Sequence, residues 1–145
     1  MITIKGKGIV PGRARAPVLV SRSPINFVAA HTKPLNALFP SWFLDPHHEL
    51  YRKDLQGTIV AFPSCIGSTW TGIVIPRLMR RKNSPAGFVV RQTDPLLVAG
   101  LVLSAVWYHR TIPVVQCEDD DLLEKISGHG PVEIDGDTGE IFVEV

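Results

Sequence analysis

The sequence has little net charge, no long hydrophobic run and no apolar block at its start, and each absence excludes a class of protein. Its 15 Lys and Arg residues almost balance its 14 Asp and Glu residues, and the net charge of +1 provides no general attraction to nucleic acid. The longest weakly charged run, Pro95–Tyr108, is too short to cross a bilayer. Because the first ten residues also lack the apolar block of a signal peptide, we expect a soluble, cytoplasmic protein with no membrane or nucleic-acid partner.

Cysteine is also scarce. Cys65 and Cys117 stand far apart and form no C-x-x-C motif. They are too few to supply the four ligands of structural zinc or of an ordinary iron–sulfur cluster. Free cysteines are among the most buried residue types, so we interpret both as buried thiols. Any metal or cluster that this protein uses is therefore expected on another chain.

The middle of the chain alternates between predicted strands and predicted helices. Strand–helix–strand order predicts right-handed crossovers and a parallel sheet, flanked here by further strands at both ends of the chain. The expected fold is α/β, one domain over residues 1–145 with three layers, β/β/α. Pro76 conflicts with the interior of a helix, and the conflict becomes smaller if that helix begins around Thr71 or later, because the amides of a first turn are unpaired anyway. The predicted strands are 2–10, 18–20, 58–62, 86–90, 113–115, 132–134 and 141–145, and the predicted helices are 73–81, 95–108 and 119–127.

Residues 28–56 have no lasting hydrophobic period and are expected to form a long irregular loop. A connection of this length in a compact domain is usually functional. Its apolar side chains argue against disorder and predict that the loop docks on the domain itself or on a second protein. These side chains are Leu35, Leu38, Phe39, Trp42, Phe43 and Leu44.

The stretch FPSCIGSTWTG, residues 62–72, joins a predicted strand to a predicted helix. Ligands of open α/β sheets bind at such turns, beyond the carboxyl end of a strand. Gly67 permits close approach of a ligand, Ser68 and Thr69 bring hydroxyl groups, and the helix amino end favours an anion. The lysine of a phosphate-binding loop and the G-x-G-x-x-G spacing are both absent. The local pattern therefore leaves open a reactive site, an anion site and a simple helix-capping turn.

A reactive Ser68 would need a neighbouring base, cation or metal, and the histidines do not provide an obvious one. No histidine stands at a recognisable triad spacing, and the adjacent pair His47 and His48 is interpreted as a surface or interface pair rather than a metal site. Cys65 as a nucleophile is the least favoured hypothesis, because no histidine is placed to lower its pKa. The five histidines are His31, His47, His48, His109 and His129.

Six motifs, taken together, resemble the small subunit of aconitase X-type enzymes, a family of swivelling domains. The resemblance covers nearly the whole chain, and its most specific part is the FPSxxGST turn directly before a helix. The motifs are GRA (12–14), PINF (24–27), DPHHELY (45–51), GTIVAFPSCIGST (57–69), TDPLLVAG (93–100) and IPVV (112–115).

The resemblance implies a β/β/α fold similar to the mobile fourth domain of aconitase. It implies a heteromeric hydro-lyase that dehydrates a small hydroxy acid, such as mevalonate 5-phosphate or cis-3-hydroxy-L-proline. In this family an iron–sulfur cluster on the large partner subunit is the Lewis acid, so this chain alone is expected to be inactive. Ser68 corresponds to the family's proton acceptor. The surrounding residues are expected to hold the substrate: Gly67, Thr69, Trp70, Thr71 and Gly72.

The chain departs from the family pattern beside the reactive turn. Trp70 and Thr71 stand where relatives have smaller or more flexible residues, and Phe27 is followed by Val-Ala-Ala instead of a Gly-Gly pair. These departures favour an alternative hypothesis, a non-enzymatic anion- or partner-binding module that retains the swivelling fold.

Overall fold

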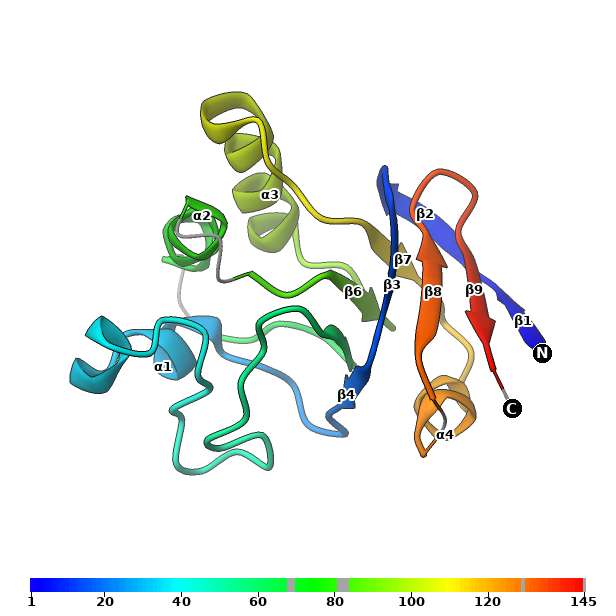
Figure 1. Ribbon diagram of the computed structural model, residues 1–145, viewed down its shortest axis with the longest axis horizontal. Coiled ribbons are helices and arrows are strands. Elements are labelled where there is room, and N and C mark those ends of the chain that lie inside the picture. Colours follow the sequence, from blue (N-terminus) through cyan, green and yellow to red (C-terminus); the bar gives the residue numbers. More distant parts are fainter. Residues whose placement is uncertain (68–69, 81–83, 129, 145) are drawn as a thin grey trace.

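The strands form two sheets in a computed structural model that describes residues 1–67, 70–80, 84–128 and 130–144 (Figure 1). The four-stranded sheet contains, in order, β1 (Ile2–Lys5), β9 (Glu140–Val143), β8 (Val132–Asp135) and β3 (Arg13–Ala16). The five-stranded sheet contains, in order, β2 (Lys7–Val10), β7 (Val114–Gln116), β6 (Gly87–Val90), β5 (Ile59–Phe62) and β4 (Val18–Val20).

The five-stranded sheet is the middle layer. Strands β4, β5, β6 and β7 run parallel, and β2 closes one edge in the antiparallel direction. Helices α2 (Thr71–Arg80) and α3 (Pro95–Tyr108) form the β5–β6 and β6–β7 crossovers and lie on one face, while the four-stranded sheet covers the other (Figure 1). The predicted α/β class and β/β/α layering are confirmed.

Strand β5 shows why the middle sheet is buried on both faces. Its four residues are fully buried and alternate in direction. Val60 and Phe62 belong to the core beneath the helices, whereas Ile59 and Ala61 belong to the core between the two sheets. Such a continuous apolar run is typical of a parallel strand covered on both sides.

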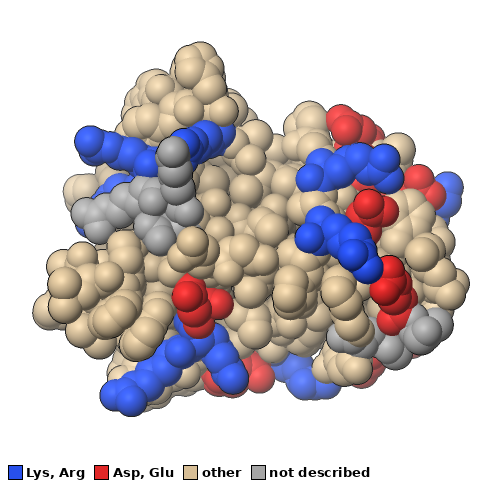
Figure 2. Space-filling model, viewed as in Figure 1, with Lys and Arg blue, Asp and Glu red and all other residues tan. Residues whose placement is uncertain are grey.

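The outer face of the four-stranded sheet carries charged side chains of both signs (Figure 2). Arg13 lies 3.7 Å from Glu133 and 3.5 Å from Asp135, and Arg15 pairs with Glu144 at 2.6 Å. Exposed pairs of this kind contribute little to stability, so this face is a solvated surface.

The amino-terminal prediction was wrong in one respect. Instead of one strand over 2–10, β1 and β2 lie in different sheets, and the chain crosses between them at Gly6. A Cβ atom on Gly6 would lie 2.4 Å from the carbonyl oxygen of Gln116, so only glycine fits this crossing. Strand β3 was not predicted because its sequence, RARA, is polar on the face turned to solvent.

The helix predictions held to different degrees. Helix α3 has the predicted bounds, because the Asp94 carboxylate accepts hydrogen bonds from the amides of Leu96 and Leu97. Helix α2 begins at Thr71, within the start predicted from Pro76 though two residues before 73, and it contains Pro76. Helix α4 (Leu122–Ile126) is shorter than the predicted 119–127. No helix in the described ranges is long and apolar enough to span a membrane.

The segment 28–56 is more regular than expected. Helix α1 (Phe27–His31) and the 3-10 helix η1 (Pro34–Ala37) occupy its beginning. Docking on the domain itself is confirmed for Phe43 and Leu44, which pack into the core, while other apolar side chains face outward and docking on a second protein stays a prediction. The outward-facing ones are Leu35, Leu38 and Phe39, of which Leu38 is 75% exposed.

Candidate functional site

The carboxyl ends of the parallel strands meet at one edge of the middle sheet, where the turn after β5 begins. The segment after β4 pairs with this turn: the amide of Ile25 donates to the carbonyl of Ser64 (3.0 Å), and the amide of Ile66 donates to the carbonyl of Ile25 (2.9 Å). Ser68 and Thr69 lie outside the described residues, so the role of Ser68 as proton acceptor stays a prediction.

Gly67 is required by the local geometry of the turn. Its φ of +99° lies in the left-handed region, and an added Cβ would lie 2.4 Å from the Nδ2 atom of Asn26. The Asn26 side chain caps α1 by accepting a hydrogen bond from the amide of Ala29. Gly67 therefore lets the turn pack directly against the beginning of α1.

Beyond the described gap, the turn leads into α2 and exposes apolar side chains. The carbonyl of Trp70 accepts hydrogen bonds from the amides of Ile73 and Val74, which starts the helix. Thr71 is buried at 3% exposure and Gly72 is partly buried. Ile66, Trp70 and Ile73, which we call the apolar rim, are 53%, 61% and 51% exposed.

Cys65 lies in the same turn and is partly buried. Burial and, to a smaller extent, the negative charge of Asp94 raise the pKa of the Cys65 thiol to about 12. The thiolate is the nucleophilic form of cysteine, so this thiol is unreactive near neutral pH. The result argues against Cys65 as a nucleophile.

Arg91 is a residue of this edge that the sequence reasoning missed. It follows β6 directly, and its backbone amide bonds to the carbonyls of Phe62 and Pro63 at the start of the turn. Its guanidinium pairs with Asp120 at 2.5 Å, while its Nε atom is buried with no partner among the described residues. Arg91 lines a cavity of about 340 Å³ with Pro63, Ser64, Gln92 and Glu118. The sequence could have indicated Arg91 as a site residue, because it directly follows a predicted strand of the parallel sheet.

Ser21, His48 and Glu49 form a second cluster beside the end of β4, and it resembles a catalytic triad. The Ser21 Oγ atom lies 3.2 Å from His48 Nε2 and 3.1 Å from Glu49 Oε1. His48 Nδ1 accepts a hydrogen bond from the amide of Leu50, so the ring proton is on Nε2 and is donated to Ser21. His48 therefore cannot accept the proton of Ser21.

The carboxylate of this cluster has a structural role. Burial alone would raise the pKa of Glu49, but hydrogen bonds from the amide of Arg22, the hydroxyl of Ser21 and the amide of Ser23 lower it overall. The ionised Glu49 thus fastens the 45–51 segment to the end of β4.

The two cysteines do not fit an iron–sulfur cluster. Cys65 packs against the core beneath the helices, and Cys117 lies in the core between the sheets. Because these cores lie on opposite faces of the middle sheet, the two thiols cannot bind one cluster together. Within the described ranges, no three or more His, Cys, Asp or Glu side chains form a group that could hold a metal ion.

Comparisons with known proteins match the whole chain. The sequence model of the aconitase X swivel domain matches residues 3–143. A Methanocella arvoryzae protein named phosphomevalonate dehydratase small subunit is 31% identical over 138 residues, covering 95% of this chain and 96% of that protein. A Pyrococcus furiosus protein of the same name is 28% identical, covering 97% of this chain and 94% of that protein.

Solved structures agree with the sequence matches. The crystal structure of Thermococcus kodakaraensis aconitase X in its holo-form has a TM-score of 0.83 at 26% identity and covers 100% of both chains. A protein solved by solution NMR shares the fold with a TM-score of 0.80, at 21% identity and with 99% of this chain covered. The resemblance inferred from the sequence is confirmed, and the chain belongs to the aconitase X swivel-domain family.

Proposed function

We propose that this chain is the small subunit of a heteromeric aconitase X-type dehydratase that acts on a small hydroxy acid, with mevalonate 5-phosphate as the first candidate. The observation that carries this proposal is the end-to-end match to proteins named phosphomevalonate dehydratase small subunit. Because these relatives are named for a phosphate ester, we favour a phosphate ester over a cis-3-hydroxy-L-proline-like substrate.

Ser68 is proposed as the proton acceptor, and the surroundings of the turn favour an anion. Helix α2 begins at Thr71, directly after the turn, so the partial positive charge of its amino end lies toward this edge. Arg91 lies at the same edge and brings a guanidinium, which Asp120 pairs with at 2.5 Å. A serine alkoxide is accessible only in a closed site where such groups stabilise it. The same groups would hold the substrate's carboxylate or phosphate.

A large partner subunit is proposed to cover this edge. The apolar rim exposes three large side chains around the turn, and Leu38 on the neighbouring segment is 75% exposed. Exposed apolar groups gathered in this way are typical of interaction surfaces. The iron–sulfur cluster of the family is proposed to belong to that partner, since the cysteines of this chain do not fit it.

A non-enzymatic anion- or partner-binding module remains the second candidate. Trp70 favours it, because an indole that is 61% exposed follows the proposed base by two positions in the sequence. In the enzyme, the same indole would have to be covered by the partner or lie against the substrate.

Co-expression with a cluster-binding large subunit of this family separates these candidates. We expect the cluster-loaded complex to dehydrate mevalonate 5-phosphate, seen by mass spectrometry as loss of one water, and the isolated chain to be inactive. Ser68→Ala should reduce kcat at least about 100-fold, as expected for loss of a general base. Ser127→Ala, after α4, is the matched control.

Two outcomes would contradict the proposal at different levels. Full activity of the Ser68→Ala complex would remove Ser68 as the base but keep the dehydratase. A complex with an intact cluster that dehydrates neither mevalonate 5-phosphate nor cis-3-hydroxy-L-proline would favour the binding module.

A further inference from the structure

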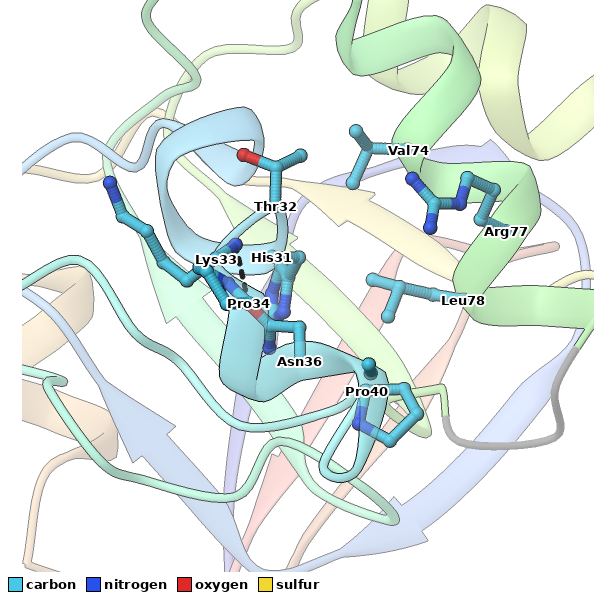
Figure 3. Close-up of a pocket in the computed structure, with 10 residues that line it drawn as sticks. His31, Thr32, Lys33, Pro34, Asn36, Pro40, Val74, Arg77 and Leu78 are labelled. Carbon is cyan, nitrogen blue, oxygen red and sulfur yellow. Dashed lines mark hydrogen bonds between the residues drawn. The ribbon is translucent and has the colours of Figure 1, made fainter.

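A cavity of about 310 Å³ lies between residues 31–40 and helix α2 (Figure 3). Its volume is at the lower end of the range for small-molecule sites. It shares no lining residue with the turn at 63–67, although α1 and α2 both begin beside that turn. The described lining residues are His31, Thr32, Lys33, Pro34, Asn36, Ala37, Pro40, Val74, Arg77 and Leu78.

Two walls of this cavity are largely apolar. In Figure 3, Val74 and Leu78 point from α2 toward the segment that carries Thr32 and Pro40. The Asn36 amide nitrogen is already engaged, since it donates to the carbonyls of Phe39 and Trp42. A ligand body between these walls would be aliphatic and short.

One cationic group is directed into the cavity. Arg77 is exposed on α2, and its guanidinium points toward Thr32 in Figure 3. Arg77 forms no ion pair with a described carboxylate, and the described lining contains no Asp or Glu. The Lys33 ammonium extends away from the cavity in the same view. A guanidinium in this position can bind a carboxylate or phosphate through two N–H groups.

His31 closes the inner side of the cavity without adding charge. Its ring packs between Phe27 (6.0 Å) and Phe43 (5.9 Å), and neither ring nitrogen forms a hydrogen bond with a described residue. Burial lowers the pKa of His31 to about 4, and the nearby carbonyls of Pro40 and Trp42 offset this only in part. The ring is therefore neutral near pH 7. Protein atoms cover both ring nitrogens, so the ring borders the cavity only as a neutral aromatic surface.

We propose that this cavity binds a small organic anion, in which one carboxylate or phosphate monoester group pairs with Arg77 and a short aliphatic body lies between Val74, Leu78 and Pro40. The site is independent of the proposed dehydratase function, because its lining excludes the turn, Arg91 and the apolar rim.

Titration of the ¹⁵N-labelled full chain, followed by NMR, tests the proposal. The probes are 3-methylbutanoate and 3-methylbutyl phosphate, and the matched neutral probe is 3-methylbutanamide. We expect saturable shifts at residues 31–40 and 74–78 with a Kd of about 1 mM for at least one anion. The stronger of the two anions identifies the ligand class. The amide should bind at least about tenfold more weakly, because it has no charge to pair with Arg77.

Two arginines on the same helix face give matched variants. Arg77→Gln should weaken binding of the anion at least about tenfold, whereas Arg80→Gln should leave it unchanged, since Arg80 is exposed and is absent from the described lining. Ala37→Phe, at an exposed position of the lining, should fill the cavity and abolish the shifts.

Three results would overturn the proposal. The first is the absence of saturable shifts with either anion, and the second is an equal loss in the Arg77→Gln and Arg80→Gln variants. The third is loss of binding in the complex with the large subunit, together with protection of residues 31–40. That result would show that the cavity receives a side chain of the partner instead.

Discussion

The turn after β5 and the cavity beside α1 differ in what makes them specific. At the turn, backbone geometry dominates: Gly67 adopts a left-handed φ, and Asn26 packs against it closely. At the cavity, side-chain chemistry dominates: a neutral, buried His31 lies on one wall, and Arg77, which forms no ion pair with a described carboxylate, lies on the other. The turn thus depends on a glycine conformation and one close contact with the segment before α1, whereas the cavity depends on the chemistry of the side chains that two packed segments bring together.

The largest expected effect is a loss of folding stability at acid pH, which tests the burial of His31 beside the cavity. The pKa of His31 is lowered from 6.5 to about 4 by burial, so the unfolded chain binds more protons than the folded chain between these values. The contribution of neutral His31 to the free energy of unfolding is therefore complete above pH 6.5. It is lost as the pH falls toward 4, which lowers the free energy of unfolding by about 3 kcal/mol in total. Urea unfolding at several pH values measures this loss.

His31→Phe is the matched variant for that measurement. Phenylalanine keeps an aromatic ring between Phe27 and Phe43 but cannot be protonated. Its free energy of unfolding should change less than that of the native chain between pH 6.5 and 4. An identical pH dependence in both proteins would show that other groups cause it.

The next effect tests the backbone geometry of the turn. Gly67→Ala should destabilise the fold by about 2 kcal/mol, from strain at positive φ together with displacement of the Asn26 cap. Gly128→Ala measures the strain alone, because Gly128 has φ of +79° and no atom within 4 Å of an added Cβ. Gly130, with open space and no positive φ, is the neutral control. Equal losses for Gly67→Ala and Gly128→Ala would mean that contact with Asn26 contributes nothing.

A smaller effect tests whether the edge of the sheet binds the substrate's anion. In the active complex, Arg91→Gln should raise KM about tenfold with a smaller change in kcat, because one charge-assisted pair is lost. Arg15→Gln, on the outer face of the four-stranded sheet, is the control. A KM that does not change would place the anion elsewhere.

The smallest expected effect concerns Cys65, which should not be alkylated in the folded chain. With a pKa of about 12, Cys65 should resist iodoacetamide at pH 8 in the folded chain and react only after unfolding in urea. Mass spectrometry of tryptic peptides reads the label at this position. Rapid labelling of the native chain would restore Cys65 as a candidate nucleophile.

The sequence predicted those elements whose apolar pattern or capping residues lie within the element itself. Apolar runs of β5 and β6 reveal buried strands, and Asp94 followed by Pro95 marks the start of α3. The family motifs added the swivel fold, which the comparisons confirm. The sequence also predicted that Gly67 and Trp70 lie at the candidate site, because both belong to the turn after a predicted strand.

Only the tertiary structure decided the features that depend on distant partners. Strand β3 exists because its polar sequence pairs with β8, and the break at Gly6 arises because the carbonyl of Gln116 approaches closely. Likewise, His31 and Arg77 become neighbours of one cavity only when α1 packs beside α2. The sequence by itself determined which segments are apolar and where they turn, since those are short-range properties. Which polar residues share a site was settled by long-range packing.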